Sequence, residues 1–272
     1  MRPCTGSRKT RSFTRKSYHS VYARGVQSRE VAIERIDGPA REGARDRVVV
    51  EAPLQLRAQG TPVAMIMRTP GHDLELVRGL LHAEGIAGGN PVQLDEDAVE
   101  TGVLPGAFTG RGLLASAACG VCGRAAIADL ELRAKEVTVD TAVAHAVIAK
   151  LPDELRTAQQ VFGETGGLHG AGLFTRTGEL LCVREDVGRH NAVDKVAGWA
   201  LATATKPDLL VLSGRAGYEL VQKAIMLGVP IVASVSAPSS LAVELAERFG
   251  VALCGFVRGA RANVYAHGWR IA

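Results

Sequence analysis

Three apolar runs near the carboxyl terminus carry the strongest fold signal: Leu209-Leu210-Val211-Leu212, Ile231-Val232-Ala233-Ser234-Val235 and Val251-Ala252-Leu253-Cys254-Gly255-Phe256-Val257. Each run has the length of a strand, and the segments between the runs carry apolar residues at helical spacing. Continuous apolar strands that alternate with helices indicate a mostly parallel sheet with both faces covered. We therefore predict a three-layer α/β/α domain over residues 140–272.

The elements upstream of these runs fit the same architecture. Residues 141–160 have helical periodicity that is interrupted near Pro152. A turn at Thr177-Gly178 joins two short strands into a hairpin. Another helix runs through Val193 and Ala200.

The amino-terminal part has a different pattern. Short strands separated by Gly and Pro are typical of an antiparallel sheet, and we expect them at residues 31–36, 47–51, 54–57 and 63–68. A helix follows that opens near Asp73 and ends at Gly85. We predict a small α+β domain over residues 30–115 and a linker over residues 116–139.

The formal net charge of +4 comes from the amino-terminal tail. Residues 1–29 hold eight Lys and Arg and no acidic residue, so residues 30–272 hold 24 basic and 28 acidic residues, a net charge of −4. We expect a disordered tail and no nucleic-acid partner. No apolar run reaches ~18 residues, so we expect no membrane span. Five cysteines without framework spacing favour a reducing, cytoplasmic location.

The linker contains the stretch Ala118-Cys119-Gly120-Val121-Cys122-Gly123-Arg124. Glycine after each cysteine gives the backbone a freedom that other residues lack, which suits a mobile, reactive loop. A thiolate there acts as a nucleophile, a redox partner or a metal ligand. The loop alone leaves open four interpretations: structural thiols, half of a zinc site, a thioredoxin-like pair, and a carrier of persulfide sulfur.

Two of these interpretations meet specific objections. His82 and Glu84 precede the cysteines as H-x-E precedes C-x-x-C in zinc deaminases. However, both close a helix of the small domain, and Ala118 stands where the deaminase signature has proline. A thioredoxin-like pair follows a strand, and no strong strand precedes Cys119. Sulfur transfer needs an exposed, movable thiol, and Arg124 favours the thiolate electrostatically.

Polar and basic residues follow the strands of the predicted α/β/α domain. Ligands gather where the carboxyl ends of parallel strands meet, and four segments converge there: Asp186–Asn191, Ser213–Arg215, Ser236–Ser239 and Arg258–Arg261. Helix amino termini with Arg and Lys nearby suit a large polyanionic ligand, such as a nucleotide-bearing cofactor. The candidate binding residues from this pattern are His169, Arg189, His190, Asn191, Lys195, Ser213, Gly214, Arg215, Arg258 and Arg261.

Several stretches together carry a family resemblance: Cys119–Gly123, Thr165–His169, Glu185–Lys195, Ser213–Arg215, Ala237–Ser239, Gly255–Gly259 and Asn263–Tyr265. With them the chain resembles the formate dehydrogenase accessory sulfurtransferase family, FdhD, over roughly residues 30–270. The glycine-flanked cysteines and the long Glu185–Lys195 motif are the specific parts of this likeness. The basic tail lies outside it.

The resemblance implies a sulfurtransferase that works through a cysteine persulfide. Sulfur would pass from a cysteine desulfurase to the bis-molybdopterin guanine dinucleotide cofactor of formate dehydrogenase, which holds molybdenum or tungsten. Cys119 would hold the sulfur and Cys122 would assist. The family's cofactor-binding stretch falls on Phe256, Val257, Arg258, Gly259, Ala260 and Arg261. The alternative is a chaperone that binds the molybdenum cofactor without chemistry.

The same resemblance carries expectations about fold and assembly. The larger domain would be similar to cytidine deaminase. The positions of the deaminase zinc ligands fall at His190 and at Ser213 to Arg215, which offer no cysteine pair, so we expect no structural metal. A homodimer is also expected.

Overall fold

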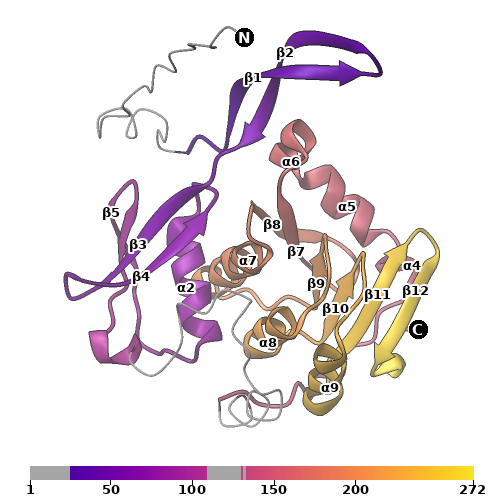
Figure 1. Cartoon of the computed structure of the whole chain (residues 1–272). Helices are drawn as coiled ribbons and strands as arrows, with labels where there is room; N and C mark the ends of the chain where they lie inside the picture. The colour runs from indigo at the N-terminus through magenta and orange to yellow at the C-terminus, as the bar shows by residue number, and fades with distance from the viewer. Residues whose placement is uncertain (1–24, 109–129, 131–132) are drawn as a thin grey trace, which may run out of the picture.

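The structure is a computed structural model of the chain and describes residues 25–108, 130 and 133–272. Cys119, Cys122 and most of the predicted tail lie outside the described residues. In the described part the strands form three sheets, of two, four and six strands (Figure 1).

The six-stranded sheet forms the centre of the larger domain. Its strand order is β12-β11-β10-β9-β7-β8, with β9, β10 and β11 parallel and the flanking strands antiparallel. The predicted parallel centre and the hairpin are confirmed, and the strands are β7 (His169–Phe174), β8 (Leu180–Asp186), β9 (Leu209–Leu212), β10 (Ile231–Ser234), β11 (Ala252–Arg258) and β12 (Arg261–Ala266).

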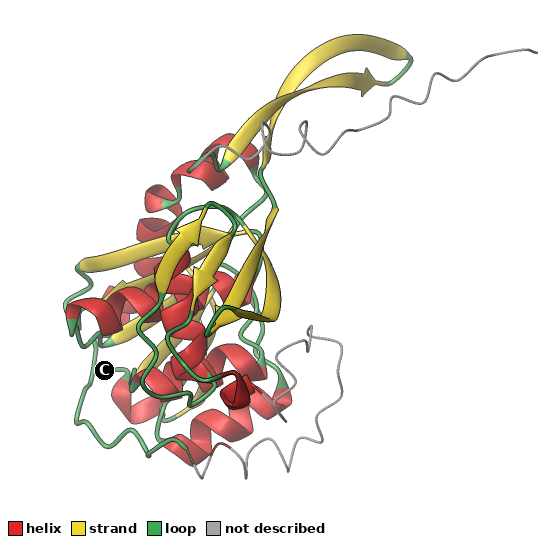
Figure 2. Cartoon of the chain, turned by 90° about the vertical axis from the view of Figure 1, so that its left-hand side faces the viewer, coloured by secondary structure: helices red, strands yellow, loops and turns green. Residues whose placement is uncertain are grey.

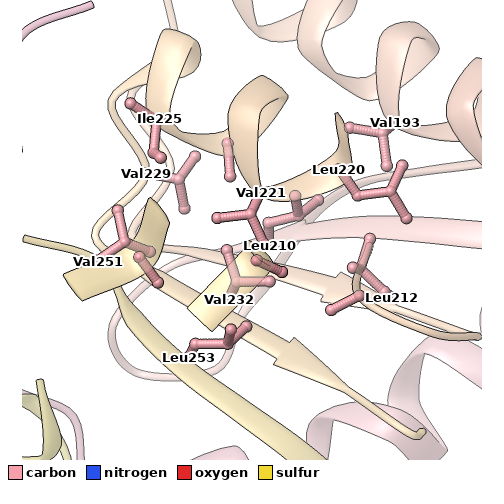
Figure 3. Packing of buried hydrophobic residues seen from close by; sticks show 14 of the residues in the cluster. Val193, Leu210, Leu212, Leu220, Val221, Ile225, Val229, Val232, Val251 and Leu253 are labelled. Carbon is pink, nitrogen blue, oxygen red and sulfur yellow. The ribbon is translucent and has the colours of Figure 1, made fainter. Parts of the chain in front are cut away.

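Helices cover both faces of this sheet, as the continuous apolar strands predict. Leu210 and Leu212 of β9 face one core, which Figure 3 shows, while Leu209 and Val211 face a second core on the other side. The first core is closed by α7 (Arg189–Thr203), α8 (Tyr218–Leu227) and α9 (Ser240–Phe249). The second is closed by α4 (His145–Ile148) and α5 (Leu151–Ala158), and α6 (Gln160–Thr165) follows.

The helical span predicted over residues 141–160 is interrupted before Pro152, as expected, but it starts later than predicted. Val143 pairs with Ile271 in an isolated bridge, so helix begins only at His145. Pro152 then stands at the start of α5, where a missing backbone N–H is tolerated. The bridge to the carboxyl-terminal Ile271 keeps Val143 out of the helix. Local periodicity cannot predict this contact, because the two residues are far apart in the sequence.

The smaller domain packs one helix on a four-stranded sheet of order β4-β3-β6-β5. Leu54, Leu56 and Val99 of the sheet share a core with Leu76 and Val77 of the helix. The elements are β3 (Ala52–Ala58), β4 (Thr61–Arg68), α2 (Asp73–Ala83), β5 (Val92–Asp95), β6 (Ala98–Glu100) and the 3₁₀ turn η1 (Pro105–Phe108).

A separate two-stranded ribbon projects from the body of the molecule (Figures 1 and 2). It consists of β1 (Ser28–Asp37) and β2 (Ala40–Val49). Ser28 and Arg29, which the prediction assigns to the tail, therefore belong to β1, because they pair with Val49 and Val48 across the ribbon.

The two domains meet where α2 packs against α7. A Cβ on Gly79 of α2 would overlap the backbone carbonyl of Asp194, and a Cβ on Gly198 of α7 would overlap that of Glu75. Glycine at both positions is what lets the two helix backbones approach so closely. Figure 1 shows the two helices side by side at the junction of the domains.

Candidate functional site: the carboxyl edge of the large sheet

The segments predicted to converge do meet at one edge of the six-stranded sheet. His169 begins β7 opposite Asp186, which ends β8. The backbone N–H of Gly170 donates to Oγ of Ser213, at 2.8 Å, and the N–H of Phe256 donates to the carbonyl of Ser236, at 3.2 Å. Oγ of Ser234 also donates to the carbonyl of Gly214, at 2.6 Å. Together these contacts join the start of β7 and the ends of β8, β9, β10 and β11 at one edge of the sheet.

A cavity of about 500 Å³ opens at this edge. Four of the predicted residues line it, namely His169, Ser213, Val257 and Arg258. The rest of the wall comes from α5, α6 and the turn that follows, with Pro152, Asp153, Leu155, Arg156, Gln159, Phe162, Gly166, Gly167 and Leu168, and from Val235.

The α5–α6 wall is the part that sequence reasoning missed. The glycine-rich entry at Gly166 and Gly167 was the one signal near it. Arg156 and Phe162 also belong together, because the guanidinium carbon lies 3.8 Å from the ring centroid. The helical periodicity of this segment predicts a helix, but it does not predict that Arg156 and Phe162 line a cavity.

Basic side chains lie near His169, and so does the carboxylate of Asp186. Partial burial lowers the pKa of His169 below its usual 6.5, and the charges of Arg189, His190 and Arg215 lower it further. Nε2 of His190 in turn lies 2.6 Å from Oε2 of Glu219. That hydrogen bond is the main reason why the pKa of Glu219 is lowered. The guanidinium groups of Arg189 and Arg215 beside His169 favour the binding of an anion at this edge.

The predicted residues Gly214, Phe256, Gly259, Ala260 and Arg261 lie at the same edge but do not line the cavity. Phe256 is 47% exposed and has φ of 52°, an uncommon conformation for a residue with a side chain. Gly259, in the turn between β11 and β12, has φ of 53°. This turn carries Arg258 and Arg261 at its two ends, both exposed.

The structure gives Lys195 and Asn191 a role other than the predicted contact with a ligand. Lys195 is completely buried, with Nζ 2.7 Å from Oδ2 of Asp186. Nδ2 of Asn191 donates to the carbonyl of Met67, at 2.8 Å, and to Oδ1 of Asp186, at 2.9 Å. The polar groups of both residues make contacts between the domains. The predicted contact of Lys195 and Asn191 with the cofactor stays a prediction.

The described ends of the cysteine-containing segment lie in different domains. Phe108 is buried in the core of the small domain, and Leu130 is buried in the first core of the large domain. Past Leu130, the buried Arg270 donates to the carbonyls of Val137, at 2.9 Å, and Val139, at 2.6 Å. The segment that holds Cys119 and Cys122 therefore connects two fixed points, one in each domain.

The two described cysteines, Cys182 and Cys254, are buried core residues, as predicted. Burial raises the pKa of Cys182 to about 12 and that of Cys254 to about 11. His82 has a structural contact: its Nε2 lies 2.8 Å from the carbonyl oxygen of Met226. This contact joins α2 to α8.

Comparison with known proteins identifies the family. The sequence model of the FdhD/NarQ family matches residues 49–272. The chain belongs to this family. A "Sulfur carrier protein FdhD" from Streptomyces avermitilis is 44% identical over 252 residues, which cover 84% of this chain and 89% of the relative. A protein of the same name from Sulfolobus acidocaldarius is 42% identical over 255 residues, which cover 90% of this chain and 99% of the relative.

The fold agrees with a solved structure. A protein from Desulfotalea psychrophila, described as a formate dehydrogenase accessory protein, matches with a TM-score of 0.73 and 24% identity over 91% of this chain and 100% of that one. The resemblance to FdhD and the α/β fold are thus confirmed. The likeness to cytidine deaminase stays a prediction. Within the described residues, no helix is both long and apolar enough to span a bilayer.

Proposed function

We propose that this FdhD/NarQ protein is a sulfur carrier that serves formate dehydrogenase, with the bis-molybdopterin guanine dinucleotide cofactor as its substrate at the carboxyl edge of the large sheet. The relatives named sulfur carrier protein FdhD support the transfer of sulfur. One observation supports the recipient: a cavity of about 500 Å³ lies beside a cationic edge. An anionic, nucleotide-bearing ligand fits that combination.

The chemical steps use the two thiols of the linker. The thiolate of Cys119 attacks the outer sulfur of a persulfide on a cysteine desulfurase, and the S–S bond of the donor breaks to release the desulfurase thiolate. Cys119 then holds the sulfur as a persulfide. Attack by the Cys122 thiolate on the inner sulfur forms a Cys119–Cys122 disulfide and releases hydrosulfide for the metal, with the dithiol supplying two electrons.

The setting of these steps is also part of the proposal. A reducing cytoplasm would return the disulfide to the dithiol. The anchored ends of the segment at Phe108 and Leu130 favour a carrier that works between the domains. The desulfurase partner and a homodimer complete the proposed assembly.

Maturation of formate dehydrogenase tests this function against a cofactor chaperone that performs no chemistry. Cells that lack their own carrier are given the wild-type chain, Cys119→Ala, Cys122→Ala or Arg258→Ala, and the activity and metal-bound sulfur of formate dehydrogenase are measured. We expect Cys119→Ala and Arg258→Ala to yield inactive enzyme. Active enzyme with Cys119→Ala but not with Arg258→Ala would favour the chaperone.

A further inference from the structure

The ribbon of β1 and β2 has little support from the rest of the described chain. In the part of the chain that the structure describes, each of its strands pairs only with the other. Its base rests on α6, where Oγ of Ser28 donates to Oε2 of Glu164, at 3.1 Å, and Nε of Arg47 lies 3.1 Å from the same oxygen. From this base the ribbon extends away from both domains (Figures 1 and 2). An isolated two-stranded ribbon is only marginally stable in water, so we expect a further contact to stabilise it.

The two faces of the ribbon differ in polarity. Directly opposed residues of an antiparallel pair share a face. Ile33 lies opposite Ala44, and Val31 is next along the same strand face; all three are half-buried, whereas most of the ribbon is exposed. We call these three residues the apolar face. The opposite face carries charges such as Glu34, whose Oε2 accepts from Nη1 of Arg41, at 2.8 Å. No described helix or strand lies over the ribbon in Figures 1 and 2.

The charge of the ribbon indicates the class of partner. Residues 28–49 hold five Arg and five Asp or Glu, so their net charge is zero. A nucleic acid or an anionic membrane would require an excess of basic residues. A surface with equal numbers of both signs is instead suited to a copy of itself, because two-fold symmetry brings the basic groups of one copy to the acidic groups of the other.

The size of the ribbon is sufficient for such a contact. A strand of ten residues extends about 30 Å, and two paired strands are about 10 Å wide. One face therefore covers roughly 300 Å² of a partner. Counted on both surfaces, one such contact buries about 600 Å², and two reciprocal contacts bury about 1,200 Å², which is the lower limit for a stable, specific interface. A reciprocal contact of two copies is therefore large enough, whereas one ribbon alone is not.

We propose that the ribbon is a dimerisation arm, and that the apolar face of each ribbon packs on a second copy of this chain in a closed two-fold dimer. This inference rests on the proposed function, which includes a homodimer, and it identifies the surface that forms that dimer. Burial of Val31, Ile33 and Ala44 supplies the apolar centre of the contact, while the surrounding charges form its polar rim.

Sedimentation equilibrium of the full chain tests the arm. We expect the wild-type chain to have twice the mass of one chain. Ile33→Asp places a carboxylate in the apolar face twice in each dimer, so we expect the dissociation constant to rise at least about 100-fold. Ala32→Asp is the matched control, because it lies on the opposite face, beside Arg45. That change should leave the dissociation constant within about two-fold of the wild-type value.

Hydrogen exchange of the wild-type chain keeps the test independent of how the variant folds. Amides of residues 28–49 should be protected in the dimer and should exchange faster once the chain is diluted below its dissociation constant. Protection that does not change with concentration would overturn the arm. A dimer of Ile33→Asp as tight as that of the wild-type chain would do the same, as would a wild-type chain that stays monomeric.

The loading of sulfur on Cys119 separates this inference from the proposed function. If the arm is overturned while wild-type Cys119 still gains sulfur from a desulfurase, the sulfur carrier stands without this interface. If Ile33→Asp loses the dimer while wild-type Cys119 gains no sulfur, the arm stands and the proposed function is contradicted.

Discussion

Nζ of Lys195 lies 2.7 Å from Oδ2 of Asp186, and both side chains are completely buried. The ammonium also donates to the carbonyl of Thr69, at 2.9 Å, while Asp186 accepts from the N–H of Thr69, at 3.1 Å. Thr69 follows β4 of the small domain, whereas Lys195 and Asp186 belong to the large domain. The pair therefore joins the two domains, next to His169 of the candidate site.

Removing one member of this pair should destabilise the chain strongly. Lys195→Met leaves a buried carboxylate without its cation, so we expect the free energy of unfolding to fall by about 3–5 kcal/mol. Urea denaturation measures the change. The matched control is Lys206→Met at an exposed position, where we expect less than about 0.5 kcal/mol. A loss as small as the control's would show that the pair does not hold the domains.

The close approach of α2 and α7 predicts that a side chain at Gly198 destabilises the chain. Gly198→Ala places a Cβ against the carbonyl of Glu75, and we expect it to lower the free energy of unfolding by about 1–3 kcal/mol or more. Gly163→Ala is the control, because it is also helical and its Cβ would have no neighbour within 4 Å. That change should be neutral or slightly stabilising. Equal effects of the two changes would contradict the observed helix packing.

The lowered pKa of His169 predicts a pH dependence. The unfolded chain binds a proton at His169 near pH 6.5 and the folded chain binds it only at lower pH, so this residue's contribution to stability is present above pH 6.5 and is lost as the pH falls towards the folded pKa. NMR titration of the ring should give a midpoint below 6.5. Arg215→Gln should raise that midpoint by removing one of the repelling charges.

Binding of an anionic ligand should also change the pKa of His169. A polyanion such as pyrophosphate would offset the charges of Arg189 and Arg215, so its addition should raise the pKa of His169. A midpoint that stays the same at saturating pyrophosphate would mean that the anion binds away from this edge.

The thiols should divide into two classes. Cys182 and Cys254 have pKa values raised to about 12 and about 11, so neither forms thiolate to a useful extent at neutral pH. We expect iodoacetamide at pH 8 to modify neither in the folded chain and both in urea. Peptide mapping by mass spectrometry measures this. Rapid modification of Cys254 in the folded chain would contradict its placement in the sheet.

The fold was predictable from sequence where burial alone determines the pattern. The runs at Leu209 and Ile231 are apolar on both sides because helices cover both faces of their sheet. Pairing with a distant partner was harder to predict. The strand β12 follows β11 through a tight turn, and its residues, such as Asn263 and Tyr265, have no distinctive alternation, so only their pairing to β11 makes them a strand.

The candidate site was partly predictable for a related reason. Arg258 and Ser213 follow apolar strands, and topology brings strand ends together, so their meeting followed from the element order. Lys195 is also a basic residue, in the motif that begins α7, so its sequence position likewise predicts contact with a ligand. Its partner at Thr69 is remote in sequence, and nothing local shows that the ammonium is used there.

The central claim is that Cys119 carries the sulfur, and intact-protein mass spectrometry tests it most directly. The chain is incubated with a cysteine desulfurase and cysteine, and peptides are then mapped without reductant. We predict a gain of one sulfur atom on Cys119 in the wild-type chain and in Cys122→Ala, and no gain in Cys119→Ala. A desulfurase that carries its own persulfide while Cys119 gains no sulfur would contradict the account.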